Sequence, residues 1–240
     1  MEVKGIVTNI NKYGESGAYV EILTSKKTFI FFIKNFFYAN KKNILLNSTL
    51  ARSYFIIDDK TGAFNDFFII DDSFRFVENI KKMLFVILIK EMIHKIFLND
   101  EKNKIFTVIY EILDILDKIN NSDEIVSLIA IFIGISLRLI GIGLKVDRCV
   151  ITGEKNNIIA VSFFDGGVVS EKAFNKKKHK FYSKTKLDII RKIFKAQESD
   201  LGKLIFQRFE TIEIISDLFN YLYLQMGIKL KNQELILKML

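Results

Sequence analysis

The stretch from Leu137 to Phe174 decides how the second half of the chain is interpreted: LRLIGIGLKVDRCVITGEKNNIIAVSFFDGGVVSEKAF. Two short pairs frame its centre, Cys149 with Thr152 and Ser170 with Ala173, and 17 residues separate the pairs. In a four-cysteine zinc ribbon, about 15–20 residues separate two C-x2-C pairs. Since three of the four positions here are not cysteines, we predict a degenerate, metal-free ribbon in which Thr152 and Ser170 hydrogen-bond across the former metal position.

Inside this stretch the sequence predicts a small β-hairpin. The apolar run Ile158 to Phe164 follows two asparagines and leads into the turn Asp165-Gly166-Gly167, and such residues punctuate strands. We expect the ribbon-like insertion to cover about residues 146–175. Zinc in a closed site mainly supplies folding energy, so apolar packing is expected to replace it here.

Before residue 73 the chain has short apolar runs, rich in β-branched and aromatic residues and separated by turn signals, which predict five strands. The pentapeptide FIIDD occurs at Phe55–Asp59 and again at Phe68–Asp72, with Gly62 between the copies, which indicates a hairpin. Five strands in this length favour a small barrel of the OB-fold type, a platform used for nucleic acids. The runs are VKGIVTNI, AYVEILT, TFIFFIK, LARSYFIID and DFFIID.

After Ser73 the apolar period becomes that of helices. Expected helices run over residues 74–97 with Ser73 as N-cap, over 104–119, from Ser122 onward, from near Thr185, and over 203–226. The 13 residues from Ile125 to Leu137 carry no charge, but a bilayer requires about 17–25 residues, so we expect a buried central helix. The predicted class is α+β: an OB-fold domain, 1–73, and a mostly helical domain, 74–240.

Composition places the chain among globular proteins of a reducing compartment. Of its 240 residues, 50% are hydrophobic and 23 are Phe, enough for a real core. The single cysteine excludes an intramolecular disulfide, and the opening MEVKGIVTNINKYGES has neither the apolar region nor the cleavage site of a signal peptide. We therefore expect a cytoplasmic protein.

The net charge of +8 is unevenly distributed. From Lys172 to Lys195 ten bases face the single acid Asp188, and from Ile22 to Ile57 six bases face none. Two basic surfaces are predicted, and such surfaces suit a polyanion such as DNA. The predicted phosphate contacts are Lys26, Lys27, Lys34, Lys41, Lys42 and Arg52 in the first half, and Lys176, Lys177, Lys178, Lys180 and Lys184 in the second.

Aromatic residues interleave with the first basic group. Phe37 and Tyr38 lie next to Lys34 and are predicted to stack on bases, which contributes about 1–3 kcal/mol per base. The alternative is that Phe36, Phe37 and Tyr38 belong to the barrel core or to an ordinary loop. For the lysines of residues 176–180, the alternative is a solvated loop.

Several of these motifs resemble the RecO family of bacterial recombination mediator and DNA repair proteins. They are LRLIGIGLKVDRC at 137–149, Gly166-Gly167, and the Tyr13-Gly14-Glu15-Ser16 turn, so the resemblance spans the chain. Members often carry zinc in the ribbon. One departure follows the third strand, where the family has a glycine and closely spaced bases and this chain reads KNFFYANKK from Lys34.

The resemblance implies a non-enzymatic mediator that binds single- and double-stranded DNA, anneals strands and assists recombinase loading. Its implied partners are RecR and the C-terminal tail of the single-strand binding protein. It implies no cofactor, no small-molecule substrate and no membrane, and a nucleoid-associated place in the cytoplasm.

Two other functions stay open. Clustered carboxylates can hold Mg2+ for a nuclease, although adjacent aspartates at strand ends usually form turns. A protein adaptor without direct DNA binding is the other alternative. His94 and His179 have no ligand spacing to Cys149, so no catalytic residue is predicted. The carboxylates concerned are Asp58, Asp59, Asp66, Asp71 and Asp72.

Overall fold

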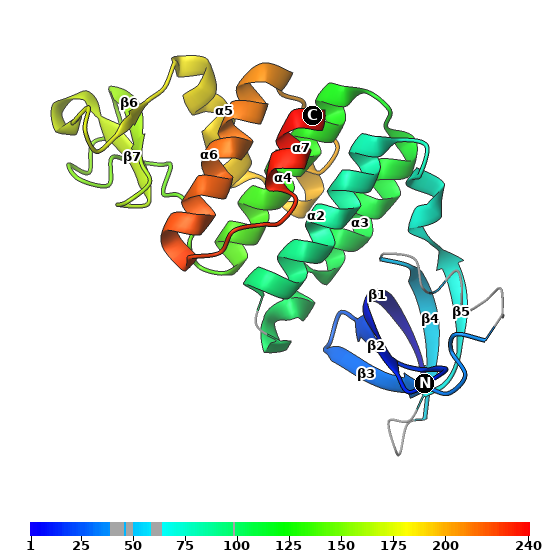
Figure 1. Cartoon of the computed structure of the whole chain (residues 1–240). Coiled ribbons are helices and arrows are strands. Elements are labelled where there is room, and N and C mark those ends of the chain that lie inside the picture. Colours follow the sequence, from blue (N-terminus) through cyan, green and yellow to red (C-terminus); the bar gives the residue numbers. More distant parts are fainter. Residues whose placement is uncertain (39–45, 47–49, 59–63, 98) are drawn as a thin grey trace. The chain divides into compact units, whose positions relative to one another are not determined.

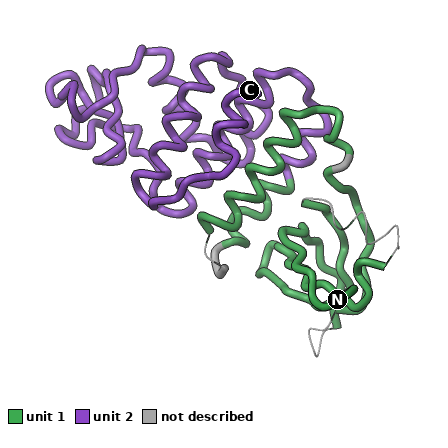
Figure 2. The backbone as a smooth tube through the Cα atoms, viewed as in Figure 1, with its two compact units in different colours: residues 1–110 green, residues 111–240 purple. Residues whose placement is uncertain are grey.

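A computed structural model describes residues 1–38, 46, 50–58, 64–97 and 99–240 (Figure 1). The chain forms two compact units, residues 1–110 and 111–240 (Figure 2). The predicted division at residue 73 stays a prediction, since the first compact unit also takes in the first long helix. The fold class is α+β, with a five-stranded antiparallel sheet followed by a helical region, as predicted.

All five predicted strands form, and they make one antiparallel sheet of order β3-β2-β1-β4-β5. The long β1 pairs with β4 through its first half and with β2 through its second, with a register shift between Val7 and Asn9. The two FIIDD copies lie on the paired strands β4 and β5, whereas Gly62 lies outside the described residues. The strands are β1 (Glu2–Tyr13), β2 (Gly17–Leu23), β3 (Thr28–Ile33), β4 (Arg52–Ile57) and β5 (Phe64–Asp71).

One face of the sheet encloses an aromatic and aliphatic core. Val20, Phe31 and Phe55 are among its buried members, as expected where alternate residues of each strand face inward. The rings of Phe31 on β3 and Phe64 on β5 have centroids 5.6 Å apart, so side chains from the two edge strands meet inside the sheet. The sheet is therefore curled, with its outward face left to the remaining side chains.

The first long helix begins later than predicted. Ser73 starts a short 3-10 helix, Ser73–Phe76, and α2 covers Ile80–Ile96. Asn79 is the N-cap because its side chain accepts from the backbone N–H groups of Lys81 and Lys82, at 3.2 and 3.3 Å. A second 3-10 helix, Asn99–Ile105, precedes α3.

The second unit is built around α4 (Ser122–Leu139), which packs against α5 (Lys184–Lys195) and α6 (Arg208–Met226). Residues Ile125 to Leu137 are all buried, which confirms the expected central helix. Gly134 allows α5 to approach closely, since a Cβ there would lie 2.5 Å from Ile193 Cγ2. The other helices are α3 (Phe106–Lys118) and α7 (Gln233–Met239). Across the described residues, no helix is long and apolar enough to cross a membrane.

The predicted hairpin is also present. β6 (Ile158–Ser162) pairs with β7 (Gly167–Ser170), and the short β8 (Lys180–Phe181) adds to the other side of β6. Gly166 has φ +69 in the connecting turn, a conformation that favours glycine. Val150 N–H donates to Val168 O at 2.9 Å, which attaches the Cys149 turn to the hairpin.

Candidate nucleic-acid interface

Three aromatic side chains cluster on the outward face of the first sheet. Tyr19 on β2 and Phe32 on β3 are direct partners in the register, and Tyr13 ends β1. Their ring centroids lie 5.3 Å (Tyr13 to Tyr19), 5.8 Å (Tyr13 to Phe32) and 5.3 Å (Tyr19 to Phe32) apart. Yet each stays between 40% and 59% exposed. We call these three residues the aromatic cluster; exposed rings of this kind offer faces on which bases can stack.

Phe37 and Tyr38 lie at the same end of the sheet as Tyr13. Phe37 N–H donates to Ser16 O at 3.0 Å, which joins the turn after β1 to the segment after β3. Phe37 and Tyr38 are exposed, whereas Phe36 is buried in the core, so the core alternative holds for Phe36 alone. Lys12 Nζ lies 5.9 Å from the Phe37 ring centroid. The predicted stacking residues thus lie next to the part of the sheet that carries the aromatic cluster.

The predicted basic residues of this unit do not form one group. Lys34 is exposed beside Phe37, but Lys26 and Lys27 lie in the turn at the opposite end of β3, about 20 Å away for a strand of this length. Lys27 Nζ lies 4.5 Å from the Phe29 ring centroid. Lys41 and Lys42 lie outside the described residues.

Arg52 does not belong to the exposed surface. It is 3% exposed, and its Nε donates to both carboxylate oxygens of Asp71 at 2.9 Å. Its guanidinium also stacks 4.5 Å from the Tyr110 ring centroid and donates to the Tyr110 carbonyl at 3.2 Å. This burial corrects the predicted phosphate contact, because a guanidinium held in this way has no route to DNA.

The carboxylates proposed for a nuclease are not gathered into a metal site by the part of the chain that is described. Asp71 pairs with Arg52 and, at 2.8 Å, with Arg75. Asp59 lies outside the described residues. Among the residues that are described, no group of three His, Cys, Asp or Glu side chains could hold a metal ion.

The two histidines have structural partners. His94 Nε2 contacts the carbonyl oxygen of Thr8 at 3.0 Å, tying α2 to the sheet. His179 is buried, and its Nδ1 accepts from Asn175 N–H at 3.0 Å. These contacts give both side chains a structural role.

Half of the bases in the second basic segment are ion-paired, mostly with acids from elsewhere in the same unit. Five of its ten bases form ion pairs, whose partners for the most part lie outside the segment. The remaining five have no ion pair within the described part of the chain: Lys176, Lys177, Lys178, Lys184 and Arg191. The pairs are Lys172 with Glu154 (2.5 Å), Lys180 with Asp217 (2.7 Å), Lys186 with Glu213, Lys192 with Asp188 (2.8 Å) and Lys195 with Asp147 (2.6 Å).

Lys180 is therefore less available than predicted. Its ammonium lies between the carboxylates of Asp217 and Glu213, and Tyr182 donates to Asp217 as well. Burial, followed by the hydrogen bond to Asp217, raises the pKa of Tyr182 far above its usual range. This cluster joins β8 to α6, and it leaves the lysines at 176–178 and Lys184 as the available members of the predicted set.

The ribbon positions confirm the predicted hydrogen bond. Thr152 Oγ1 lies 3.0 Å from Ser170 Oγ, and the sulfur of Cys149, 1% exposed, accepts from Thr152 N–H at 3.4 Å. Burial raises the pKa of the Cys149 thiol, but hydrogen bonds from the side chains and backbones of Ser170 and Thr152 outweigh it and bring the pKa to about 6. Ala173 lies half-buried in the 3-10 helix that follows β7.

The family model described as "Recombination protein O C terminal" matches residues 77–234. The chain belongs to the recombination protein O (RecO) family. The match covers α2 to α6 and the whole ribbon, while the N-terminal sheet lies outside it. A search of curated proteins found no match. Membership of the RecO family assigns the chain a role in recombinational DNA repair.

Two features of this RecO protein were not predicted from the sequence. Tyr19 had a signal, because it shares the polar face of β2 with Glu21, whereas TFIFFI is apolar on both faces and gave no signal for Phe32. No signal in the sequence showed that Arg191 lacks an ion pair, since the neighbouring bases of α5, such as Lys192 and Lys195, are paired with acids in the fold.

Proposed function

We propose that the chain is a DNA-binding recombination mediator that acts without a catalytic step, and that its N-terminal sheet is an OB-fold. The order β3-β2-β1-β4-β5 and the meeting of Phe31 with Phe64 from the two edge strands support a barrel of this kind. The family resemblance implies three further partners: RecR, the C-terminal tail of the single-strand binding protein, and double-stranded DNA. It also implies that the protein acts at the nucleoid.

The observation that carries the proposal is the aromatic cluster in a member of a DNA repair family. The three large rings pack against one another, Tyr13 edge to face with the other two, yet they stay exposed, which is costly in water unless a ligand covers them. Single-strand binding surfaces combine such rings with nearby cations, and Lys12 and Lys34 lie at this end of the sheet. The surface therefore suits bases stacked in sequence-tolerant fashion.

Titration of labelled single-stranded DNA against Tyr19→Ala and Phe32→Ala variants tests the proposal. Each lost stacking contact should weaken binding by about 1–3 kcal/mol, roughly 5- to 150-fold. Phe209→Ala is the control, because Phe209 is also a highly exposed aromatic but lies at the start of α6. No DNA affinity at low salt would sink the proposal and leave the adaptor alternative. Mg2+-dependent strand cleavage lost in Asp71→Asn would make the protein a nuclease.

A further inference from the structure

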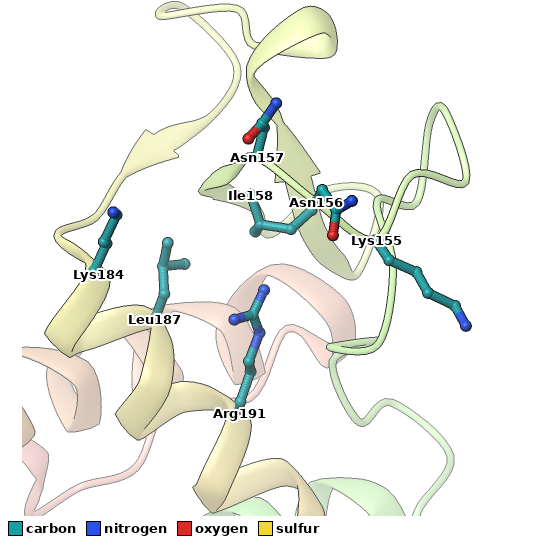
Figure 3. A pocket seen from close by; sticks show the side chains of 7 residues that line it. All are labelled: Lys155, Asn156, Asn157, Ile158, Lys184, Leu187 and Arg191. Carbon is teal, nitrogen blue, oxygen red and sulfur yellow. The ribbon is translucent and has the colours of Figure 1, made fainter.

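A pocket of about 630 Å3 lies between α5 and the segment that leads into β6 (Figure 3). Lys184, Leu187 and Arg191 of α5 form one wall, and residues 155–158 form the other. The volume is within the range of small-ligand sites, about 300–1,000 Å3. None of the DNA contacts predicted from the sequence, except Lys184, belongs to it.

Helix geometry explains why α5 presents these three side chains together. Positions 184, 187 and 191 are spaced three and four residues apart and share one face of the helix. The helix begins here because Ser183 Oγ accepts from Lys186 N–H at 3.3 Å. Figure 3 shows Lys184 and Arg191 rising from α5 toward the opposite segment, with Leu187 between them.

The opposite wall is set by the ribbon. Asn157 adopts φ +54, a left-handed conformation that asparagine tolerates, and its carbonyl accepts from Glu171 N–H at 2.9 Å. Ile158 then turns inward and is buried, whereas the amides of Asn156 and Asn157 stay exposed. Lys155 stands at the rim, with its side chain directed away from the pocket.

The pocket carries uncompensated positive charge. The side chains of Lys184 and Arg191 face it, Lys155 stands at its rim, and no carboxylate lines it. None of these three has an ion pair within the part of the chain that the structure describes. Lys192, the residue after Arg191, differs in this respect because it pairs with Asp188 at 2.8 Å. Asp188, the acid nearest to Lys184 and Arg191 along α5, is thus paired with Lys192 and does not line the pocket, so the charges that face the pocket are positive and favour an anionic ligand.

We propose that this pocket binds the phosphodiester backbone of single-stranded DNA, with Arg191 and Lys184 as the phosphate contacts. Arginine presents paired N–H donors that match phosphate oxygens. The asparagine amides can donate to and accept from sugars and base edges, above the apolar floor of Ile158 and Leu187. The inference rests on the proposed DNA binding and gives it a second contact region, in the ribbon and α5.

A polynucleotide fits better than an acidic peptide because the available cations are spread out. Lys176, Lys177 and Lys178 are exposed and lie six or more residues before Lys184, which spans at most about 20 Å for the nearest of them. An acidic peptide with a short cluster of carboxylates could pair with the cations of the pocket alone and would not need the lysines at 176–178. A chain of regularly spaced phosphates can contact both places at once.

Fluorescence anisotropy of labelled oligo-dT with the full-length chain tests the inference. The double variant Lys184→Gln/Arg191→Gln removes the two contacts, and Lys192→Gln/Lys195→Gln removes the same charge from paired lysines of the same helix. With a slope of about −0.7 per phosphate contact, each lost contact weakens binding about 5-fold near 0.1 M salt. The pocket variant should bind roughly 25-fold more weakly, with its log-log salt slope shallower by about 1.4, while the control changes less than about 2-fold.

Four outcomes would overturn the inference. Equal losses in the two double variants would show a general charge effect. Unchanged affinity in the pocket variant would remove the pocket from the DNA path, yet leave the proposed function standing on the wild-type binding. Unchanged DNA affinity with lost binding of labelled poly-aspartate would make it a peptide site. Wild-type protein without DNA affinity at low salt would overturn the inference together with the proposed function. Lys184 is exposed and Arg191 half-buried, so thermal melting should find the variants folded.

Discussion

Restoring the three missing thiols tests whether the ribbon backbone still has the shape of a metal site. The side chains of Cys149, Thr152 and Ser170 already converge, with 3.0 Å between Thr152 Oγ1 and Ser170 Oγ. In a tetrahedral site with Zn–S bonds of about 2.3 Å, the sulfurs are about 3.8 Å apart. The substituted atoms need to separate by only about 1 Å. We therefore expect Thr152→Cys/Ser170→Cys/Ala173→Cys to bind one zinc ion.

Two opposing terms set the size of the effect on stability. The triple variant loses the bond between Thr152 and Ser170, worth about 1 kcal/mol. Zinc at about 1,000 times its Kd adds about 4 kcal/mol. The net gain is about 3 kcal/mol, or roughly 6–12 °C in Tm for a chain of this length. Without metal, the same variant should melt about 2–4 °C below the wild type.

Elemental analysis and thermal melts with zinc or with a chelator measure these changes. Adding Cys149→Ser to the triple variant is the control, because it removes one ligand and keeps the other three substitutions. A triple variant that binds no zinc, and whose Tm ignores the chelator, would show that the spacing is not that of a zinc ribbon. Stoichiometric zinc in the wild-type protein would refute the metal-free ribbon directly.

Two further predictions concern single residues. Cys149 is the only cysteine, so its thiolate absorbance in the ultraviolet should titrate with a midpoint of about 6, and a midpoint near the usual value of about 8.5 would contradict the hydrogen-bonded geometry. Because this pKa lies below that of the unfolded chain, the stabilisation should be complete above about pH 9 and lost as the pH falls through about 6, and Cys149→Ser should remove that dependence of the unfolding free energy. Gly134→Ala should lower Tm, since a Cβ 2.5 Å from Ile193 Cγ2 and 2.9 Å from Ile193 O costs about 1–3 kcal/mol, more than the gain of about 1 kcal/mol in helix propensity. Ser136→Ala on the same helix is the comparison and should not lower Tm. It removes a buried hydroxyl that has no hydrogen-bond partner among the described residues.

Features that depend on local patterns could be predicted from the sequence. The five strands follow from alternation and turn residues, and the burial of α4 follows from the uncharged run Ile125 to Leu137. The hydrogen bond between Thr152 and Ser170 follows from the spacing of the ribbon positions. The start of α2 was missed because both Ser73 and Asn79 are good N-caps, and only the geometry shows that Asn79 binds the first free N–H groups.

Which bases of the candidate site are available could not be predicted, because it depends on acids that are distant in the sequence. Lys180 and Lys186 belong to a strongly basic segment, yet both are neutralised by α6, about 30 residues later. Arg52 lies in a run without acids, but it is buried against Asp71 on the neighbouring strand. Counting charges along the chain therefore overestimated the number of exposed, unpaired cations, while it gave no reason to single out Arg191.

These pairings give the ribbon a more specific role than stability alone. The turn at Cys149 is closed by Cys149 N–H donating to Glu154 O at 2.7 Å, and the residues that follow are the pocket wall, Lys155 to Ile158. Lys172 pairs with Glu154 at 2.5 Å across the ribbon, which ties the segment after β7 to the residue that precedes the pocket wall. A hydrogen-bonded ribbon can thus position one side of the pocket without metal. The bases that pair with acids of the same unit and the two that face the pocket, Lys184 and Arg191, are separate sets. One basic segment can therefore stabilise the fold and, under the proposed function, also contact DNA.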